Sequence, residues 1–386
     1  MQRIVVAGGG VFGLTAALSL RRRGWQVELF DPGPIPHPLA ASTDASKAVR
    51  ADYGADEGYT ALAEHALAGW RAWNAAWGEP LFHETGCAFL SRAPLAAGGF
   101  EADSFALLTR RGHAPERLDA GEIARRFPAF RPGAFVDGYY NPTGGWAESA
   151  RVVERLAAEA RAEGVAVRAG APVREIALEG DRAVGLRIGA GEVARADVVL
   201  IAAGSWTPAL VPALAPHLHA VGQPIFHLAP ADPAPYQRLP MFGADIARTG
   251  WYGFPAMTGG TVKVANHGVG RRVDPADQDR TVPEPMERAL CAFLADALPG
   301  LAGAPIVHRR LCAYSDSRDG DFWIAPDPTH PGLVVAAGGS GHAFKFAPVL
   351  GGLVADAVEG RASRWSPRFR WREAKRAREE ARFAGG

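Results

Sequence analysis

Cysteine is scarce in this sequence, and neither sign of charge predominates. Three cysteines, at positions 87, 291 and 312 of 386 residues, are too few and too scattered for a disulfide framework or a zinc cluster. The 42 basic and 41 acidic residues give a formal net charge of +1, which leaves no broad field to attract nucleic acid or an anionic membrane. No apolar run approaches the roughly 18 residues of a membrane span, and the histidines lack the spacing of metal ligands. The chain enters a strand pattern without a leader segment, so we expect a cytoplasmic protein with no nucleic-acid, membrane or metal partner.

The remaining composition is that of a large globular enzyme. Hydrophobic residues make up 48% and charged residues 22% of the chain, and these values are ordinary for soluble domains. The length predicts two domains, possibly three. A basic stretch near the C-terminus, 368–383, predicts an exposed helix rather than a nucleic-acid surface.

The first 31 residues predict a nucleotide-binding βαβ unit. A short apolar strand leads into a glycine turn, and a helical pattern leads on to a second strand that ends at Asp31. Gly8, Gly10 and Gly13 fit the dinucleotide fingerprint, in which glycines make the turn, let the backbone approach a pyrophosphate and let the helix pack on the strand. The free N–H groups at the start of the helix then face the phosphates. Asp31 is placed to bind ribose hydroxyls, which argues against NADP.

A second glycine-rich junction, near the end of the chain, favours FAD over NAD. An apolar strand over 333–337 meets the glycines of 338–341, and a helix follows. Such a junction places backbone donors and a helix dipole beside a flavin ring, whose N1–C2=O edge becomes negative on reduction. A similar strand runs into Gly204. We therefore expect a nucleotide domain assembled from separate pieces of the chain, with another segment inserted.

Several further segments, in the same order along the chain, resemble a known family. The opening glycine unit, ASTDASKAVRADYG, WYGFP, TVKVANHG, LCAYSDSRDGDF and GGSGHAFKF are similar to segments of monomeric sarcosine oxidase and of its N-methyltryptophan, pipecolate, saccharopine and fructosyl-amino-acid oxidase relatives. These enzymes are D-amino-acid-oxidase-like FAD flavoproteins, and the resemblance covers essentially the whole chain. It implies an α/β (α+β two-domain) flavoprotein with a Rossmann-like FAD-binding domain and an inserted substrate domain built on a mixed β-sheet. The implied FAD-binding domain comprises 1–82, 146–219 and 308–386, and the substrate domain comprises 83–145 and 220–307.

The resemblance also implies roles for individual residues. Cys312 matches the cysteine that carries FAD through a thioether to its 8α-methyl group, although a single cysteine is ordinarily a small core residue. Lys263 matches a lysine that lies over the flavin and promotes its reoxidation by O2, because a fixed cation stabilises the reduced oxygen. The alternative for Lys263 is an edge-strand lysine with its ammonium in water. His267 and Tyr252 are expected to line the pocket, although both residue types are as often structural.

Arg50 and Lys345 are the candidates for binding a substrate carboxylate. The family's matching positions do so, and a guanidinium fork suits a carboxylate; the alternative is a salt bridge to one of the acidic residues. Lys47 stands where the sarcosine-type pattern has an arginine, which is closer to the pipecolate, saccharopine and fructosyl members. The full set of expected cofactor contacts is Gly8, Gly10, Val11, Phe12, Gly13, Asp31, Ser42, Lys47, Arg50, Val173, Gly204, Cys312, Gly339, Gly341, His342 and Lys345.

The resemblance predicts an FAD-dependent oxidase that converts the C–N bond of a secondary amine, an N-substituted or cyclic α-amino acid, to an imine and passes the electrons to O2 to give H2O2. Its expected partners are this small-molecule substrate and O2, and we expect a monomer or a weak dimer. Three alternatives stay open. The substrate could be larger, such as saccharopine or a fructosyl amino acid; the enzyme could be a dehydrogenase with a protein acceptor; or the chain could bind FAD as a scaffold without turnover, against which Arg50, Lys263, Cys312 and Lys345 speak together.

Overall fold

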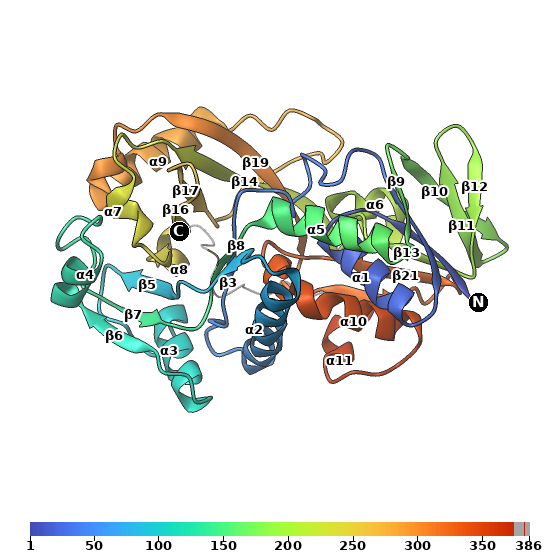
Figure 1. The fold of residues 1–386 in the computed structure, drawn as a ribbon, viewed down its shortest axis with the longest axis horizontal. Coiled ribbons are helices and arrows are strands. Elements are labelled where there is room, and N and C mark those ends of the chain that lie inside the picture. Colours follow the sequence, from blue (N-terminus) through green and yellow to red (C-terminus); the bar gives the residue numbers. More distant parts are fainter. Residues whose placement is uncertain (374–381, 383–386) are drawn as a thin grey trace.

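The computed structural model describes residues 1–373 and Arg382, and it has two large β-sheets that lie side by side (Figure 1). A six-stranded sheet contains the N-terminal strand. Its order is β20-β21-β13-β1-β2-β9, and every neighbouring pair is parallel except β20 and β21. The strands are β1 (Arg3–Ala7), β2 (Gln26–Asp31), β9 (Ala166–Ala169), β13 (Val198–Ile201), β20 (Trp323–Pro326) and β21 (Leu333–Ala337).

Pieces of the chain that are far apart in the sequence thus meet in one parallel sheet, as the glycine junctions predicted. The central strands are almost completely buried; all five residues of β21 and four of the five in β1 are shielded from solvent. Apolar runs without alternation suit such strands, because helices or other strands cover both faces of a parallel sheet.

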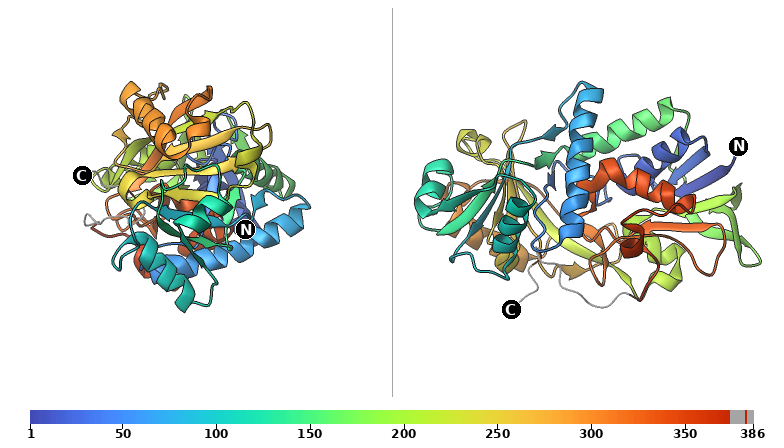
Figure 2. Two further views of the ribbon diagram at one scale, coloured as in Figure 1. Left: turned by 90° about the vertical axis from the view of Figure 1, so that its left-hand side faces the viewer. Right: turned by 90° about the horizontal axis from the view of Figure 1, so that it is seen from below.

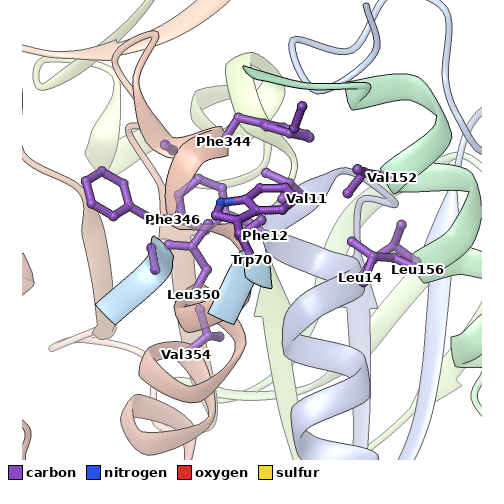
Figure 3. Close-up of a cluster of buried hydrophobic side chains, with 14 of the residues drawn as sticks. Val11, Phe12, Leu14, Trp70, Val152, Leu156, Phe344, Phe346, Leu350 and Val354 are labelled. Atoms are coloured by element: carbon purple, nitrogen blue, oxygen red, sulfur yellow. The ribbon is translucent and has the colours of Figure 1, made fainter. Parts of the chain in front are cut away.

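Four helices and their contacts join this sheet to the rest of the molecule. Helices α1 (Val11–Arg22), α5 (Ser149–Ala162) and α10 (Ala347–Val358) pack on one another against the sheet, while α2 (Glu57–Trp77) stands between the two halves (Figure 2). One hydrophobic cluster links all four helices (Figure 3). Its labelled members are Val11, Phe12 and Leu14 of α1, Trp70 of α2, Val152 and Leu156 of α5, Phe344 and Phe346 just before α10, and Leu350 and Val354 within α10.

A second sheet forms the other half of the molecule. Its order is β18-β14-β17-β16-β15-β5-β7-β6, with β19 also paired to β14; β15 and β5 are parallel and the other pairs are antiparallel. The strands are β5 (Cys87–Ser91), β6 (Glu116–Asp119), β7 (Asp137–Asn141), β14 (Leu218–Leu228), β15 (Met241–Ala244), β16 (Trp251–Ala256), β17 (Val262–Asn266), β18 (Arg271–Arg272) and β19 (Ile306–Ser317). The expected mixed α/β architecture with a mixed sheet in the second half is confirmed.

Shorter elements complete the described part of the chain. Two three-stranded sheets consist of β10 (Val173–Glu179), β11 (Arg182–Ile188) and β12 (Glu192–Arg195), and of β3 (Lys47–Val49), β8 (Gly145–Ala147) and β4 (Phe82–His83). The remaining helices are α3 (Phe100–Arg110), α4 (Ala120–Arg126), α6 (Thr207–Leu210), α7 (Ala234–Gln237), α8 (Ile246–Thr249), α9 (Glu284–Ala297) and α11 (Ser366–Phe369), and a 3-10 turn, η4 (Ala343–Phe346), precedes α10. Most of the helix expected over 368–383 lies outside the described residues. Over 1–373, no helix has the length and apolar character needed to cross a bilayer.

Candidate functional site

A cavity of about 610 Å³ lies where the parallel strands β1, β2 and β13 end. The turn after β1, the end of β2, the turn after β13 and the glycine junction after β21 all contribute to its wall. In an open parallel sheet this edge is the usual place for a ligand. Of the expected cofactor contacts, the following line this cavity: Gly8, Gly10, Val11, Phe12, Asp31, Ser42, Lys47, Val173, Gly204, Gly339 and Gly341.

The glycine turn fits a dinucleotide. Gly8 has φ +113°, and a Cβ there would lie 2.4 Å from the carbonyl oxygen of Ala202. A Cβ on Gly13 would lie 1.8 Å from the carbonyl oxygen of Gly8, so only glycine lets α1 pack this tightly on the turn. Helix α1 begins after Gly10, which offers no capping side chain, and its first turn contains no acid. The Val11 N–H at the start of α1 donates to Ser42 Oγ at 3.1 Å; the N-terminal dipole and the following N–H groups of the first turn point to this side of the cavity, where they suit phosphates.

Asp31 lies at the end of β2, as predicted, and it organises the turn as well as lining the cavity. Its two carboxylate oxygens accept hydrogen bonds from the N–H groups of Gly9 at 2.8 Å and Gly33 at 3.1 Å. Burial raises the pKa of Asp31, although both N–H groups act in the opposite direction. A carboxylate oxygen has two acceptor positions, so these bonds leave capacity for a ribose hydroxyl.

A smaller cavity of about 50 Å³ adjoins the large one. The two share Lys47, Tyr314, Gly341 and Phe344 as wall residues. The small cavity is lined by Lys47, Ala48, Arg50, Met241, Ile246, Tyr252, Phe254, His267, Tyr314, Gly341, His342, Phe344 and Lys345. Six side chains singled out in the sequence thus come together from both halves of the molecule: Lys47, Arg50, Tyr252, His267, His342 and Lys345. We assign it as the candidate substrate pocket.

Among the described residues of this pocket, Arg50 gives the strongest indication of what the pocket binds. It is only 5% exposed, yet it forms no hydrogen bond or ion pair with the described residues, and its buried Nη1 has no partner. Aromatic rings surround its guanidinium, with Cζ 5.1 Å from the ring centre of Tyr53, 5.6 Å from Phe89 and 5.5 Å from Phe100. Cation–π contacts hold the group in place without consuming its donors. A buried cation with open donors is costly unless an anion binds it.

Lys345 lies on the same side of the pocket and is 4% exposed. Its Nζ donates to the hydroxyl of Tyr53 at 2.9 Å and to the carbonyl oxygen of His342 at 3.2 Å. The indole N–H of Trp70 donates to the Lys345 carbonyl at 2.7 Å, which ties η4 to α2. His342 is fixed in turn by Tyr53 on Nδ1 and by the Gly320 carbonyl on Nε2, each at 3.0 Å.

Lys263 lies behind the pocket wall rather than in it. This residue of β17 is fully buried, and its Nζ donates to Asp44 Oδ2 at 2.5 Å and to the carbonyl oxygen of Ser46 at 2.7 Å. The ring of Phe254, which lines the small cavity, has its centre 4.8 Å from Nζ. Burial lowers the pKa of Lys263 to about 8, although Asp44 acts to raise it. The ammonium can therefore gain and lose its proton near neutral pH.

Asp44 is a central residue that sequence reasoning missed. Its carboxylate lies 2.5 Å from Lys263 Nζ, 3.6 Å from Lys47 Nζ and 3.3 Å from His227 Nε2. Burial alone would raise the pKa of Asp44, but Lys263, Lys47 and His227 together bring it well below its usual range. The only feature of the sequence that could have marked Asp44 as a site residue is its place within the family-like segment ASTDASKAVRADYG. Its role becomes visible only when β17 is brought against that segment.

Cys312 is buried on β19 and faces this charged cluster. Its Sγ lies 3.8 Å from Lys47 Nζ. Cys312 does not itself line either cavity, but the next residue, Ala313, lines the large one and Tyr314 lines both. Burial acts to lower the pKa of Lys47, but Cys312 and Asp44 outweigh it, so the pKa lies above its usual value.

Tyr252 and His267 also line the small cavity. The Tyr252 hydroxyl is 3.5 Å from that of Tyr314, and burial raises the pKa of both phenols. The ring of His267 lies 6.0 Å from that of Tyr314, and its backbone N–H donates to the Gly250 carbonyl at 2.7 Å. Gly13 lines neither cavity and acts through packing alone. Among the described residues, no group of three metal-ligating side chains is placed to hold a metal ion.

The sequence pattern of the family described as FAD dependent oxidoreductase matches residues 3–357 of this chain. The chain belongs to this family. This FAD-dependent oxidoreductase is 31% identical over 361 residues to an N-methyl-L-tryptophan oxidase of Salmonella arizonae, covering 92% of this chain and 93% of the relative. It is 30% identical to the enzyme of the same name from Salmonella typhimurium, covering 93% and 95%.

Solved structures give the same result for the fold. The fructosyl amine:oxygen oxidoreductase Amadoriase I from Aspergillus fumigatus superposes with a TM-score of 0.86 at 25% identity, covering all of this chain and 93% of the other. A modified fructosyl peptide oxidase from Aspergillus nidulans superposes with a TM-score of 0.88 at 23% identity and shows the fold alone. The predicted family is therefore confirmed: this chain is an enzyme of the FAD-dependent oxidoreductase family, and the relatives named here are oxidases.

Proposed function

We propose that the chain oxidises the C–N bond of a secondary amine, an N-substituted or cyclic α-amino acid, to an imine, with O2 as the electron acceptor and H2O2 as a product. The observation that supports this proposal most is Arg50. A guanidinium that is 5% exposed and has no polar partner among the described residues lines a pocket beside the large cavity. A carboxylate is the anion that matches its planar donor fork.

The residues of the pocket suggest how the substrate is held. Arg50 and Lys345 bind its carboxylate, and the apolar side chains of Met241, Ile246 and Phe254 exclude water from the remainder of the molecule. No acid occurs among the described residues that line this pocket. The amine therefore binds in its neutral form, since a cationic apolar pocket disfavours a second positive charge. A separate general base is then not required.

FAD, when bound, would supply the electron acceptor for oxidation of the carbon next to nitrogen and, once reduced, the reductant for O2. Lys263 contributes a buried positive charge behind the wall of the small cavity, and this charge stabilises the negative charge that develops when oxygen is reduced. Asp44 and the Ser46 carbonyl fix the position of that ammonium.

FAD fits the large cavity, and we assign the residues that hold it. Gly8, Gly10, Asp31 and the start of α1 line the cavity and would hold the nucleotide end of FAD, and the glycine junction after β21 would contact its flavin end. We further propose the thioether to Cys312, which is supported by the family resemblance and by the 3.8 Å distance from Cys312 Sγ to Nζ of Lys47, a residue that lines both cavities. The corresponding domain division is an FAD-binding domain of 1–82, 146–219 and 308–386, with the remainder as the substrate domain. A cytoplasmic location and a monomer or weak dimer stay predictions.

Anaerobic bleaching of the bound flavin tests the proposal without assuming an acceptor. The panel comprises sarcosine, N-methyltryptophan, pipecolate, proline, saccharopine and fructosyl-valine, each mixed with the oxidised enzyme and followed by visible absorbance. Bleaching by one amine and recovery of the colour with stoichiometric H2O2 on admission of air are the expected results. If no member of the panel bleaches the flavin, the proposed oxidation of an amine is contradicted.

A second candidate is an oxidase of larger amines, such as saccharopine or fructosyl amino acids. Lys47 and the fold shared with Amadoriase I favour it. In the same panel, bleaching by fructosyl-valine or saccharopine alone would identify it. A dehydrogenase with a protein acceptor is distinguished by bleaching that air reverses only slowly.

A further inference from the structure

A second carboxylate is buried close to Arg50, yet it is not paired with it. Asp52 follows two residues after Arg50 and is completely buried. No ion pair within 4.0 Å joins these two side chains, which both belong to the described residues. The positive charge of Arg50 acts to lower the pKa of Asp52, but burial outweighs it and the pKa lies above its usual value. Two opposite charges are thus held near each other in the core without forming the bond that ordinarily joins them.

Two side chains of β7 hold the Asp52 carboxylate. The hydroxyl of Tyr139 donates to Oδ1 at 2.8 Å, and the amide of Asn141 lies 3.5 Å from Oδ1 and 3.4 Å from Oδ2. Tyr139 and Asn141 are two positions apart on one strand, so their side chains point to the same face. The Asn141 amide is oriented in turn, because its Oδ1 accepts the backbone N–H of Thr143 at 3.0 Å.

The hydroxyl of Tyr139 has a fixed position. The side chain is fully buried; its ring stacks on Phe89 with centres 5.5 Å apart and meets Phe105 edge-on at 5.8 Å. Burial raises the pKa of Tyr139 well above its usual value, and Asp52 adds to this, so the phenol keeps its proton and donates it. Phe89 also contacts the guanidinium of Arg50, so one aromatic layer holds both the cation and the donor.

We propose that Tyr139 and Asn141 are positioning residues that keep Asp52 from closing onto Arg50, so that the guanidinium stays open to the carboxylate of the substrate. The inference rests on the proposed role of Arg50 in carboxylate binding. Asp52 supplies a countercharge that makes burial of Arg50 tolerable, while its tether leaves the donor fork unoccupied. Removing the tether lets Asp52 form the ion pair and compete with the ligand.

The test measures binding rather than turnover. Cyclopentanecarboxylate carries the carboxylate of a cyclic amino acid but no nitrogen to oxidise, so its dissociation constant can be measured on the holoenzyme by calorimetry and by the change in flavin absorbance. We expect Tyr139→Phe to weaken its binding by about tenfold or more, because a charge-assisted competitor is released. Asn141→Ser shifts the dissociation constant in the same direction by a smaller factor.

Two further variants separate this role from a structural one. Asp52→Asn cannot pair with Arg50, so it binds the probe at least as tightly as the wild type, and the double variant Tyr139→Phe/Asp52→Asn returns to within about threefold of Asp52→Asn. Tyr140→Phe is the matched control, since its hydroxyl bonds the Thr85 carbonyl at 3.1 Å instead, and it leaves binding unchanged.

Equal binding by Tyr139→Phe and the wild type would overturn the inference, as would a double variant that stays weak. If the wild type itself fails to bind the probe while Arg50→Gln makes no difference, the proposed carboxylate role of Arg50 fails instead, and the inference falls with it.

Discussion

The buried pair of Asp44 and Lys263 predicts how the oxidative half-reaction responds to pH. Lys263 has a pKa of about 8, so the ammonium is mainly charged below pH 8 and mainly neutral above it. If the cation assists reduction of O2, the rate constant for flavin reoxidation is high below pH 8 and falls above it. Asp44→Asn removes the charge that sustains the protonated form, so the midpoint of this fall moves to lower pH.

The size of that movement follows from the geometry. Opposite charges at the 2.5 Å separation of Nζ and Oδ2 interact by about 6–7 kcal/mol at an effective dielectric constant of about 20. At 1.36 kcal/mol per tenfold change this interaction corresponds to at most about five pH units. Asparagine keeps a hydrogen bond, and the Ser46 carbonyl stays at 2.7 Å from Nζ. If only about a quarter of this maximum is realised in Asp44→Asn, the midpoint of the pH profile still moves by about one pH unit.

The assay is stopped-flow reoxidation of reduced enzyme with O2 between about pH 6 and pH 10. Lys263→Met gives the reference profile, which is slow and independent of pH in this range, while its rate of reduction by substrate changes far less. Asp356→Asn is the matched control, because it removes a carboxylate that is paired with Arg23 at 2.7 Å and lines neither cavity. Superimposable profiles for the wild type and Asp44→Asn would refute the reasoning, as would equal effects of Lys263→Met on reduction and reoxidation.

Four further predictions concern the substrate and cofactor. Arg50→Gln keeps side-chain length but loses the charge, so KM for the amino acid rises about 100-fold in steady-state assays with oxygen uptake; an unchanged KM contradicts carboxylate binding. Acid precipitation leaves a yellow pellet from the wild type and a colourless one from Cys312→Ser; a yellow supernatant over a colourless wild-type pellet rules out the thioether. Gly13→Ala, whose Cβ meets the Gly8 carbonyl at 1.8 Å, loses FAD on gel filtration and melts at a lower temperature. The dissociation constant of the substrate falls about tenfold per pH unit from pH 7 to 9 as the amine loses its proton, whereas cyclopentanecarboxylate shows no such slope.

The nucleotide half of the molecule was predictable because its signals are local and agree with one another. A buried strand, a glycine turn, a helix and a terminal acid occur within the first 31 residues, and similar strand-to-glycine junctions mark β13 and β21. Each junction indicates the carboxyl end of a strand in a parallel sheet. The three segments could therefore be assigned to one sheet without knowledge of the chain between them. The resemblance then supplied the roles of Arg50 and Lys263, which residue patterns alone left open.

The charged network around these residues was not predictable, because its members meet only in the folded chain. Asp44 and Lys263 are 219 positions apart, and Asp52 and Tyr139 are 87 apart. The small sheet that carries Lys47 has strands of two or three residues, too short for any periodicity in side-chain polarity. In such a segment, the neighbouring sequence of an acid that becomes buried does not differ from that of an acid that stays on the surface.

The positive side chains of the site fall into two groups with different surroundings. Lys47 and Lys263 share the carboxylate of Asp44, which neutralises part of their charge. Arg50 and Lys345 instead face the small cavity across Tyr53, at 5.1 and 5.0 Å from its ring centre, and the described lining of that cavity contains no acid. In the proposed function, this second group binds the carboxylate of the substrate. The small cavity shares Lys47, Tyr314, Gly341 and Phe344 with the larger one, so in the proposed function the C–N bond of a substrate held by Arg50 and Lys345 reaches toward the space assigned to FAD.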